Sequence, residues 1–409
     1  MYLNFAWRYF KAKKSANAIN IIAWVTVGVI AFATACQILV LSVFNGFEGL
    51  VKSLYSSFYA DLKIIPAKGK TFILTAAEIN KLKQQPGINA VSMVAEERTL
   101  ILNKEQEKQS VPMLKGVDEN YKYVTELADK IYQGSYKLGT ADNPGLIVGA
   151  GVQNAAEINV GGAVQPSEVT LVLPRKGKIS ASNLEESITE GNALATGVFA
   201  IQQDFDNNYC ITNIDFVKQQ MGFAADEYSA AEIKLHTNTP VERAQKQLQS
   251  LLGSNYKVES KYQQNMSLYN TMRMEKWVIY AVLTLILLVA AFNMISALTM
   301  LVLEKQKDIN VLQSMGADKS MVQKIFLSEG LLLGGIGAGT GILLALIICF
   351  LQVKYKLIKL QGGTFIIDYF PVQLVLSDFI LVAATAAFIA FLASWFPAKK
   401  AANQPFELR

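Results

Sequence analysis

Four long apolar segments constrain the fold of this chain more than any other feature of its sequence. Each has at least 18 residues and almost no charge, and they span residues 19–44, 277–303, 326–351 and 379–396. An apolar helix of about 20 residues crosses the hydrocarbon core of a bilayer, roughly 30 Å thick, with its backbone hydrogen bonds satisfied internally. With 52 % hydrophobic and 17 % charged residues, the chain is also too apolar for a soluble protein of 409 residues. We therefore predict an α-helical membrane protein with four transmembrane helices.

Basic residues in the tails and short loops predict the orientation of these spans. They are Arg8, Lys11, Lys13, Lys14, Lys305, Lys307, Lys319, Lys324, Lys399, Lys400 and Arg409. Because basic loops stay in the cytoplasm, we expect cytoplasmic residues 1–18, 304–325 and 397–409, with residues 45–276 and 352–378 outside. The net charge of +5 follows from this topology, and no basic cluster indicates binding to nucleic acid.

The N-terminal residues allow more than one interpretation. Aromatic residues followed by lysines within residues 1–18 predict a cytoplasmic helix in the membrane interface, and a disordered tail is the alternative. The small residues before Cys36 resemble a signal cleavage site. The apolar run continues through Phe44, however, which favours a first span that is kept.

Residues 45–276 predict an α+β extracytoplasmic domain on helical stalks. Apolar residues keep helical spacing after the first span as far as Tyr59, and a similar segment precedes the second span. Capping boxes at Thr75 and Thr239 each open a helix between two strand-like runs, which predicts two β-α-β units. The segment between them, residues 99–216, is rich in Gly, Asn and short β-like runs and predicts a β-rich lobe.

The segment 304–325 between the second and third spans predicts a short amphipathic helix. Glu304 and Asp308, one helical turn apart, fall on its apolar side with no basic neighbour there except Lys305, which indicates a basic partner. A helix resting on lipid headgroups is the alternative, although anionic headgroups would repel these carboxylates. The predicted contact residues are Glu304, Asp308, Ile309, Leu312, Met315 and Gly316.

The residues needed for catalysis or ion coupling are not present in a recognisable pattern. The single histidine, His236, has no second metal ligand nearby, and Gly69-Lys70-Thr71 lacks the glycine that a phosphate-binding loop has five residues earlier. The interiors of the spans carry essentially no ionisable groups. We therefore expect no metal, no cofactor and no enzymatic activity in this chain, so that energy enters from a partner through residues 304–325.

Several motifs resemble the FtsX-like permease family of ABC transporters. An acid after the second span is followed by Asp308-Ile309, Val311-Leu312 and Gly316-Ala317, then by F-L-x-E-G at residues 326–330. Residues 41–48 (LSVFNGFE), 113–118 (MLKGVD) and 397–401 (PAKKA) resemble the LolC/LolE branch, the membrane subunits of the lipoprotein-releasing complex. The resemblance runs essentially from end to end.

This resemblance implies a function and a set of partners. It implies a permease of a type VII ABC transporter in the bacterial inner membrane, with a MacB-like periplasmic domain and residues 304–325 as the coupling helix. The implied partners are a pair of ABC ATPase subunits that hold ATP and Mg, a second permease copy or paralogue, membrane lipids, a lipoprotein substrate and a periplasmic lipoprotein carrier. A MacB-like efflux permease, an FtsX-like regulator of cell-wall hydrolases, and a membrane-anchored binding or assembly protein without an ATPase remain open.

The resemblance also implies two binding sites. A hook that engages the carrier corresponds to residues 173–192, and its candidate residues are Pro174, Arg175, Lys176, Gly177 and Lys178. An ordinary hairpin turn is the alternative. An apolar edge for acyl chains is implied at the end of the first span, with Val40, Val43, Phe44, Phe47, Trp277 and Tyr280. Packing of the first span against the second is the alternative for this edge.

Overall fold

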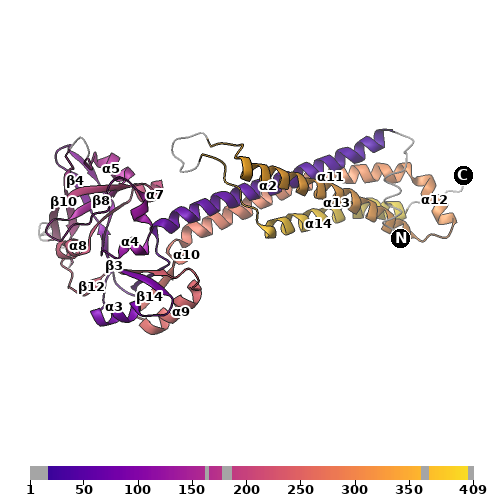
Figure 1. Ribbon diagram of the computed structural model, residues 1–409. Coiled ribbons are helices and arrows are strands. Elements are labelled where there is room, and N and C mark those ends of the chain that lie inside the picture. Colours follow the sequence, from indigo (N-terminus) through magenta and orange to yellow (C-terminus); the bar gives the residue numbers. More distant parts are fainter. Residues whose placement is uncertain (1–16, 162–164, 177–186, 361–367, 404–409) are drawn as a thin grey trace. The chain divides into compact units, whose positions relative to one another are not determined.

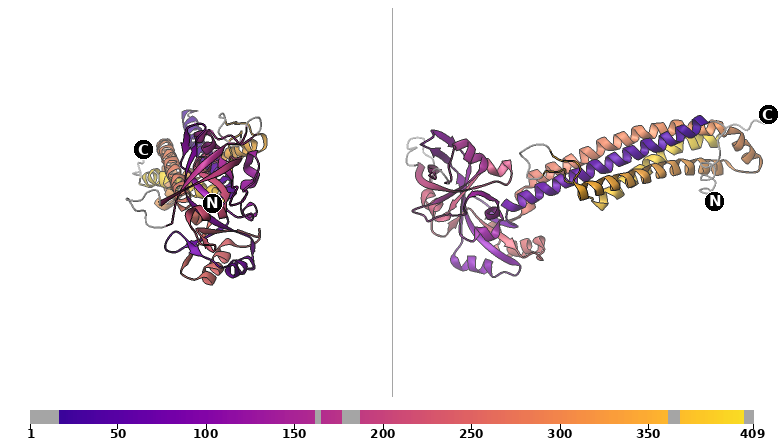
Figure 2. Two further views of the ribbon diagram at one scale, coloured as in Figure 1. Left: turned by 90° about the vertical axis from the view of Figure 1, so that its left-hand side faces the viewer. Right: turned by 45° about the horizontal axis from the view of Figure 1, so that its top comes forward.

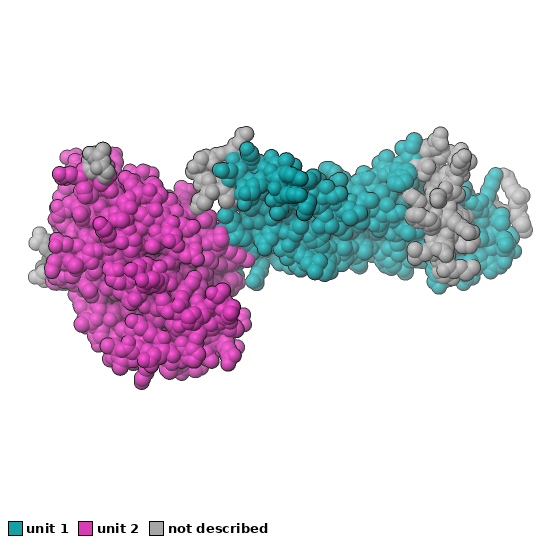
Figure 3. Space-filling model, in the orientation of Figure 1, with its two compact units in different colours: residues 1–50, 270–409 teal, residues 51–269 magenta. Residues whose placement is uncertain are grey.

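The protein is described here from a computed structural model, which describes residues 17–161, 165–176, 187–360 and 368–403. The predicted interfacial helix, apart from residues 17 and 18, therefore lies outside the described residues, as do Gly177 and Lys178. The chain divides into two compact units (Figure 3), residues 1–50 with 270–409 and residues 51–269. We call them the membrane unit and the sheet unit.

The membrane unit is built from four long helices that run alongside one another (Figures 1 and 2). They are α2 (Asn17–Phe58), α11 (Met266–Glu304), α13 (Lys319–Tyr355) and α14 (Leu376–Ala402), joined in part by the short α12 (Gln306–Ser314). Within the described residues these four are long and apolar enough to cross a membrane. Each predicted span lies inside one of them. With 42 residues, α2 is about twice as long as a span requires, and its last turns belong to the sheet unit.

Small residues bring these helices into close contact. A Cβ atom on Gly341 of α13 would lie 2.4 Å from the carbonyl oxygen of Ala31 in α2, and one on Gly334 would lie 2.4 Å from the Cβ of Ala390 in α14. Larger residues at either position would push the helices apart. These glycines of α13 are therefore explained by packing within one chain.

The sheet unit contains a 12-stranded sheet within the described residues. Its order is β14-β1-β13-β3-β6-β11-β8-β10-β9-β4-β5, with β7 paired to β10. The strands are β1 (Leu62–Pro66), β3 (Ile88–Arg98), β4 (Leu100–Asn103), β5 (Lys108–Ser110), β6 (Met113–Val117), β7 (Ile131–Gly134), β8 (Gly145–Gly149), β9 (Glu168–Pro174), β10 (Ile188–Phe199), β11 (Tyr209–Asn213), β13 (Ala230–Leu235) and β14 (Tyr256–Ser260).

Short elements complete this unit. The strands β2 (Phe72–Ile73) and β12 (Glu227–Tyr228) form a separate pair. The helices are α3 (Ala76–Lys83), α4 (Tyr121–Val124), η1 (Leu127–Lys130), α5 (Ala150–Ala156), α7 (Gln203–Asp206), α8 (Ile214–Met221), α9 (Val241–Leu252) and α10 (Lys261–Gln264).

Two crossover connections are interleaved at one end of the large sheet. The chain passes from β1 through α3 to β3, and β13 lies between these two strands. It passes from β13 through α9 to β14, and β1 lies between those two. Each connection therefore encloses a strand of the other, which gives the local order β14-β1-β13-β3.

The predicted helix starts are correct in one case and wrong in the other. Thr75 makes a complete capping box with Glu78 at the start of α3. At α9 the N-cap is Pro240, no side chain caps the helix, and the hydroxyl of Thr239 donates to the carbonyl of Gly87 instead. Pro240 therefore precedes the first helical position of α9.

The β-rich segment does not form a separate sheet. The 11-residue strand β3 pairs with β13 from Ile88 to Val94 and with β6 from Val94 to Arg98. Strand β6 in turn pairs with β11, and the ladder continues through β8 and β10. The predicted lobe is thus joined to the crossover units through one shared strand, and two apolar cores, one large and one around Phe58, stabilise this continuous sheet.

Candidate functional site

The segment between α11 and α13 is anchored to the membrane unit by one buried side chain. Helix α11 ends at Glu304, α12 follows, and Gly316 turns the chain with a φ of 94°. Asp318 then caps α13 by accepting from the backbone N–H of Met321 at 2.8 Å. Ile309 is 1 % exposed in a cluster with residues of α11, α13 and α14. A displacement of α12 would therefore act directly on these three helices.

The other predicted contact residues of this segment differ in exposure. Met315 is 80 % exposed and its neighbour Val311 is 58 % exposed, so an apolar surface faces outward. Leu312, Glu304 and Asp308 are half-buried. The Nζ atom of Lys305 lies 3.0 Å from the Oδ2 atom of Asp308. Asp308 thus has a basic partner within this chain, the neighbouring Lys305.

The hook prediction falls on the connection between β9 and β10. These strands pair from Glu168 to Pro174, and the N–H of Arg175 donates to the carbonyl of Ser187 at 2.8 Å, which closes the base of a hairpin. Arg175 is exposed and Pro174 half-buried. The described part of this hairpin ends at Lys176.

Lys176 belongs to the base of this hairpin and not to its tip. Its Nζ atom lies 2.6 Å from Oε1 of Glu227, whose side chain is 4 % exposed. The hydroxyl of Thr71 donates to the same oxygen at 2.6 Å, and the N–H of Ala224 donates to Oε2. Burial raises the pKa of Glu227, but the hydrogen bonds from Lys176, Thr71 and Ala224 outweigh it and leave the pKa below its ordinary value.

The six residues predicted to form the acyl-chain edge do not share one environment. Val40 of α2 and Trp277 of α11 are 41 % and 58 % exposed. Val43, Phe44, Phe47 and Tyr280 are half-buried. The ring of Phe47 packs edge-on against Phe370 at 5.9 Å, and the hydroxyl of Tyr280 contacts that of Thr385 in α14. Val40 and Trp277 are therefore the members with the most open surface.

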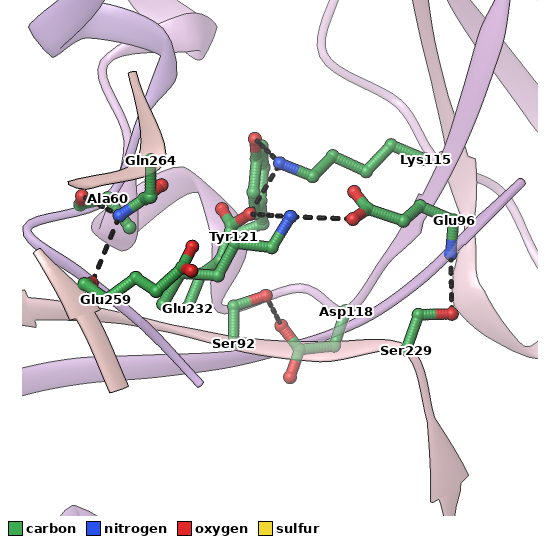
Figure 4. Close-up of polar contacts among 11 residues, drawn as sticks. Ala60, Ser92, Glu96, Lys115, Asp118, Tyr121, Ser229, Glu232, Glu259 and Gln264 are labelled. Carbon is green, nitrogen blue, oxygen red and sulfur yellow. Dashed lines mark hydrogen bonds and ion pairs between the residues drawn. The ribbon is translucent and has the colours of Figure 1, made fainter. Parts of the chain in front are cut away.

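A buried charge network in the sheet unit was not predicted (Figure 4). The Nζ atom of Lys115 lies 2.6 Å from Oε1 of Glu232, and the two side chains are 2 % and 1 % exposed. Lys63 contacts Glu96 at 2.6 Å, and the hydroxyl of Tyr121 accepts from Lys115 at 3.2 Å. Burial lowers the pKa of Lys115, but the carboxylates of Glu232 and Glu96 outweigh it and leave the pKa raised.

This network lies near the end of α2 and the start of α11, where these two helices connect to the sheet. The ring of Phe58, the last residue of α2, is 5.1 Å from the Nζ atom of Lys115 and stacks on Phe205 at 4.5 Å. Shortly before α11, the side chain of Gln264 donates to the carbonyls of Ala60 and Glu259 at 3.2 and 3.4 Å. The two connections are therefore joined to each other and to the network. Lysine and glutamate inside the apolar runs MLKGV and AAEIKL were the only sequence signal for it.

Within the described residues, no group of three or more His, Cys, Asp or Glu side chains lies close enough to share an ion. The sites described above consist of buried charge pairs and exposed apolar side chains. They suit docking and mechanical connection.

Comparison with known proteins agrees with this character. Residues 280–406, which include most of α11 and all of α12, α13 and α14, match the family described as FtsX-like permease C-terminal. The lipoprotein-releasing system transmembrane protein LolC of Neisseria meningitidis serogroup B is 26 % identical, over 98 % of this chain and 96 % of that protein. Residues 280–406 are therefore similar to the FtsX-like permease family, and nearly the whole chain is similar to LolC.

Other relatives extend the likeness to the segment outside the family match. The corresponding protein LolE of Haemophilus influenzae is 25 % identical, over 98 % of this chain and 97 % of that protein. LolC and LolE are thus similar to this chain to nearly the same degree. Among solved structures, the periplasmic region of MacB from Actinobacillus actinomycetemcomitans aligns with 51 % of this chain at 16 % identity and a TM-score of 0.35.

Proposed function

We propose that this chain is the permease subunit of an ATP-driven type VII ABC transporter that extracts lipoproteins from the outer leaflet of the bacterial inner membrane. The observation that carries the proposal is its similarity to LolC and LolE over 98 % of its length, including the segment around α12. In this role the large sheet unit is periplasmic, both termini are cytoplasmic, and a periplasmic carrier receives the lipoprotein. The chain itself has no enzymatic activity and no cofactor, because ATP and Mg belong to the ATPase.

The proposed mechanism begins at α12. A pair of ATPase subunits docks on this segment, for which the exposed side chains of Val311 and Met315 provide apolar surface. Because Ile309 is buried against α11, α13 and α14, movement of α12 displaces these helices. Transfer of work through packed helices needs no chemistry in this chain.

Transfer to the periplasmic side relies on α2 and α11, each of which has residues in both units. At the sheet unit, Phe58 and the ion pair of Lys115 with Glu232 anchor α2. A buried ion pair fixes a geometry because separating its members leaves an uncompensated charge. We infer that the sheet unit moves when α2 moves, while Arg175 and the segment after it meet the carrier.

Photocrosslinking tests the substrate assignment. A photoreactive residue in place of Phe44, in the complex with its ATPase and a second permease chain, should capture a triacylated lipoprotein before ATP is added and lose it afterwards. The matched control replaces Phe388, which is 61 % exposed on α14, and should label lipid only. Adducts restricted to neighbouring helices at position 44, with and without ATP, would refute the assignment.

A further inference from the structure

Three helices of the membrane unit are joined by a small group of polar side chains. The Nζ atom of Lys276 in α11 lies 3.0 and 2.9 Å from Oδ1 and Oδ2 of Asp378, in the first turn of α14. Asn45 of α2 donates from Nδ2 to Oδ2 of Asp378 at 2.7 Å and accepts from Lys276 at 2.9 Å through Oδ1. We call these three residues the polar clamp. It lies at the end of the bundle where α14 begins.

Two members of the polar clamp, Asn45 and Asp378, are buried, and Lys276 is half-buried. The side chain of Asp378 is 10 % exposed and that of Lys276 28 %, and Asn45 is 4 % exposed. A carboxylate removed from water needs a cation and hydrogen-bond donors, and here Asp378 receives both from two other helices. Moving any one of the three helices away would leave a charge or an amide without its partner.

The segment before α14 closes over the same place. A Cβ atom on Gly46 would lie 2.2 Å from the carbonyl oxygen of Pro371, so this segment lies directly on α2. The N–H of Gln373 donates to the carbonyl of Ser42 at 3.0 Å. Separating the start of α14 from α2 would therefore also break the contacts that this segment makes with α2.

Two further polar contacts continue along α11. Tyr280 contacts Thr385 of α14 through its hydroxyl, and Thr284 accepts from the side chain of Gln37 in α2 at 3.1 Å. Positions 276, 280 and 284 are spaced by one helical turn and share one side of α11. Apolar packing is non-directional, whereas these contacts fix the three helices in register.

We propose that Asn45, Lys276 and Asp378 are positioning residues for transport, which hold this end of α2, α11 and α14 together as one body. The apolar cluster around Ile309 contains residues of α11, α12, α13 and α14 but, within the described residues, none of α2. Movement of α12 therefore reaches α2 only through the other helices of the bundle. Among the contacts that join those helices to α2, the polar clamp supplies directional hydrogen bonds and an ion pair. The inference rests on the proposed function only in taking lipoprotein release as the transport that these residues serve.

Charge exchange tests this role in the assembled complex in lipid nanodiscs. Asp378→Lys should reduce lipoprotein release per ATP hydrolysed by about tenfold, because it places a second cation beside Lys276 and leaves neither with a carboxylate. Lys276→Asp combined with Asp378→Lys should recover most of the loss, since the pair is rebuilt with its charges reversed. The matched control is Glu275→Lys, an exposed neighbour on the same turn, which should behave as the wild type. Equal release by Asp378→Lys and the wild type, or no recovery in the exchange variant, would overturn the proposal.

Hydrogen exchange gives a readout that needs no substrate. Backbone amides of residues 42–49 should exchange about tenfold faster in Asp378→Asn than in the wild type, and at an unchanged rate in Glu275→Gln. Unchanged exchange in Asp378→Asn would contradict the polar clamp itself. A wild-type complex that releases no lipoprotein would instead count against the proposed function and leave this measurement valid.

A covalent lock covers the case in which charge variants fail to assemble. In a chain with Cys36→Ala, Cys210→Ala and Cys349→Ala, the pair Gln37→Cys and Thr284→Cys joins α2 to α11 by oxidation or by a short thiol-reactive linker. The polar clamp stays intact in this variant, and helices that move as one body should keep their release activity after linking. Loss of release on linking, restored by a reductant, would show that the helices must separate and would overturn the proposal.

Discussion

The carbonyl oxygen of Pro371 lies 2.2 Å from the position that a Cβ atom of Gly46 would occupy. We therefore expect Gly46→Ala to destabilise the membrane unit by about 1–3 kcal/mol, because backbone atoms must shift to admit one methyl group. Gly335→Ala is the matched control, since a Cβ there meets nothing within 4 Å. Thermal unfolding of the purified chain compares the two, and an equal effect of both substitutions would contradict this account.

The buried pair of Lys115 and Glu232 supplies a second prediction. Lys115→Met leaves Glu232 buried without its cation and should lower the free energy of unfolding of the sheet unit by about 3–5 kcal/mol. The double variant Lys115→Met with Glu232→Leu should recover most of this loss, while the contact of Lys63 with Glu96 remains. No tryptophan lies between residues 51 and 269, so protection of backbone amides from hydrogen exchange is the suitable measurement. A double variant less stable than the single one would argue against pairing.

Acidification should weaken the base of the hairpin between β9 and β10. The pKa of Glu227 is lowered in the folded chain, so its contribution to stability is present above the unfolded value of about 4.3 and disappears as the pH falls through the folded pKa. Lys176→Gln removes one donor and so raises the folded pKa of Glu227; the variant should lose less stability on acidification, and the loss should be complete at a higher pH. Denaturant unfolding between pH 7 and pH 3 measures the shift, with Lys68→Gln, an exposed lysine, as the control. Identical pH profiles of Lys176→Gln and the wild type would refute the assignment.

The acidic residues Glu304 and Asp308, at the end of α11 and in α12, give a prediction for docking of the ATPase. Reversing Glu304 and Asp308 to lysine should uncouple transport and leave the chain inserted, if these carboxylates meet basic residues of the ATPase. The exchange Lys305→Asp with Asp308→Lys rebuilds the internal ion pair and inverts the charge at position 308. Loss of copurified ATPase in the exchange variant would support docking, whereas a wild-type yield would assign Asp308 to internal pairing alone.

Arg175 and Lys178 are the basic residues with which to test carrier binding by the predicted hook. Arg175→Glu with Lys178→Glu should abolish capture of an acidic carrier and change ATP hydrolysis by the complex little, because neither residue lies near α12 in the chain. Lys176 is left unchanged, since its contact with Glu227 is structural. Full capture of the carrier by this double variant would return the segment to an ordinary hairpin turn.

Features that depend on neighbouring residues were predictable from the sequence. The turn at Gly316 and the cap at Asp318 follow from local backbone preference, and the four long helices follow from hydrophobicity. The pair of Lys115 and Glu232 did not follow, because 117 positions separate its members and only strand order brings them together. Lys276 and Asp378 each stand immediately before a predicted span, where a charged residue is ordinary. Their contact becomes visible only when the helices are packed.

The continuity of the large sheet could not be predicted from the sequence either, because it depends on which strands pair. Val94 belongs to both halves of β3, and no residue type marks the position where one partner strand gives way to the next. At Thr239 the local pattern was misleading, because a tertiary contact with Gly87 used the hydroxyl that the capping box required.

The way in which α2 and α11 join the sheet has a mechanical consequence. Helix α2 leads into β1 and α10 follows β14, and these antiparallel neighbours begin and end at the paired residues Leu62 and Ser260. Force that drew the two helices apart would break the β1–β14 ladder one residue pair at a time, starting at Leu62 and Ser260. Movement of both helices together would put no tension on it. Lys261 holds Asp61 at 3.1 Å where peeling would start. Separation of the two helices is therefore resisted only by these contacts, broken one after another, whereas movement of both helices together leaves the contacts unchanged.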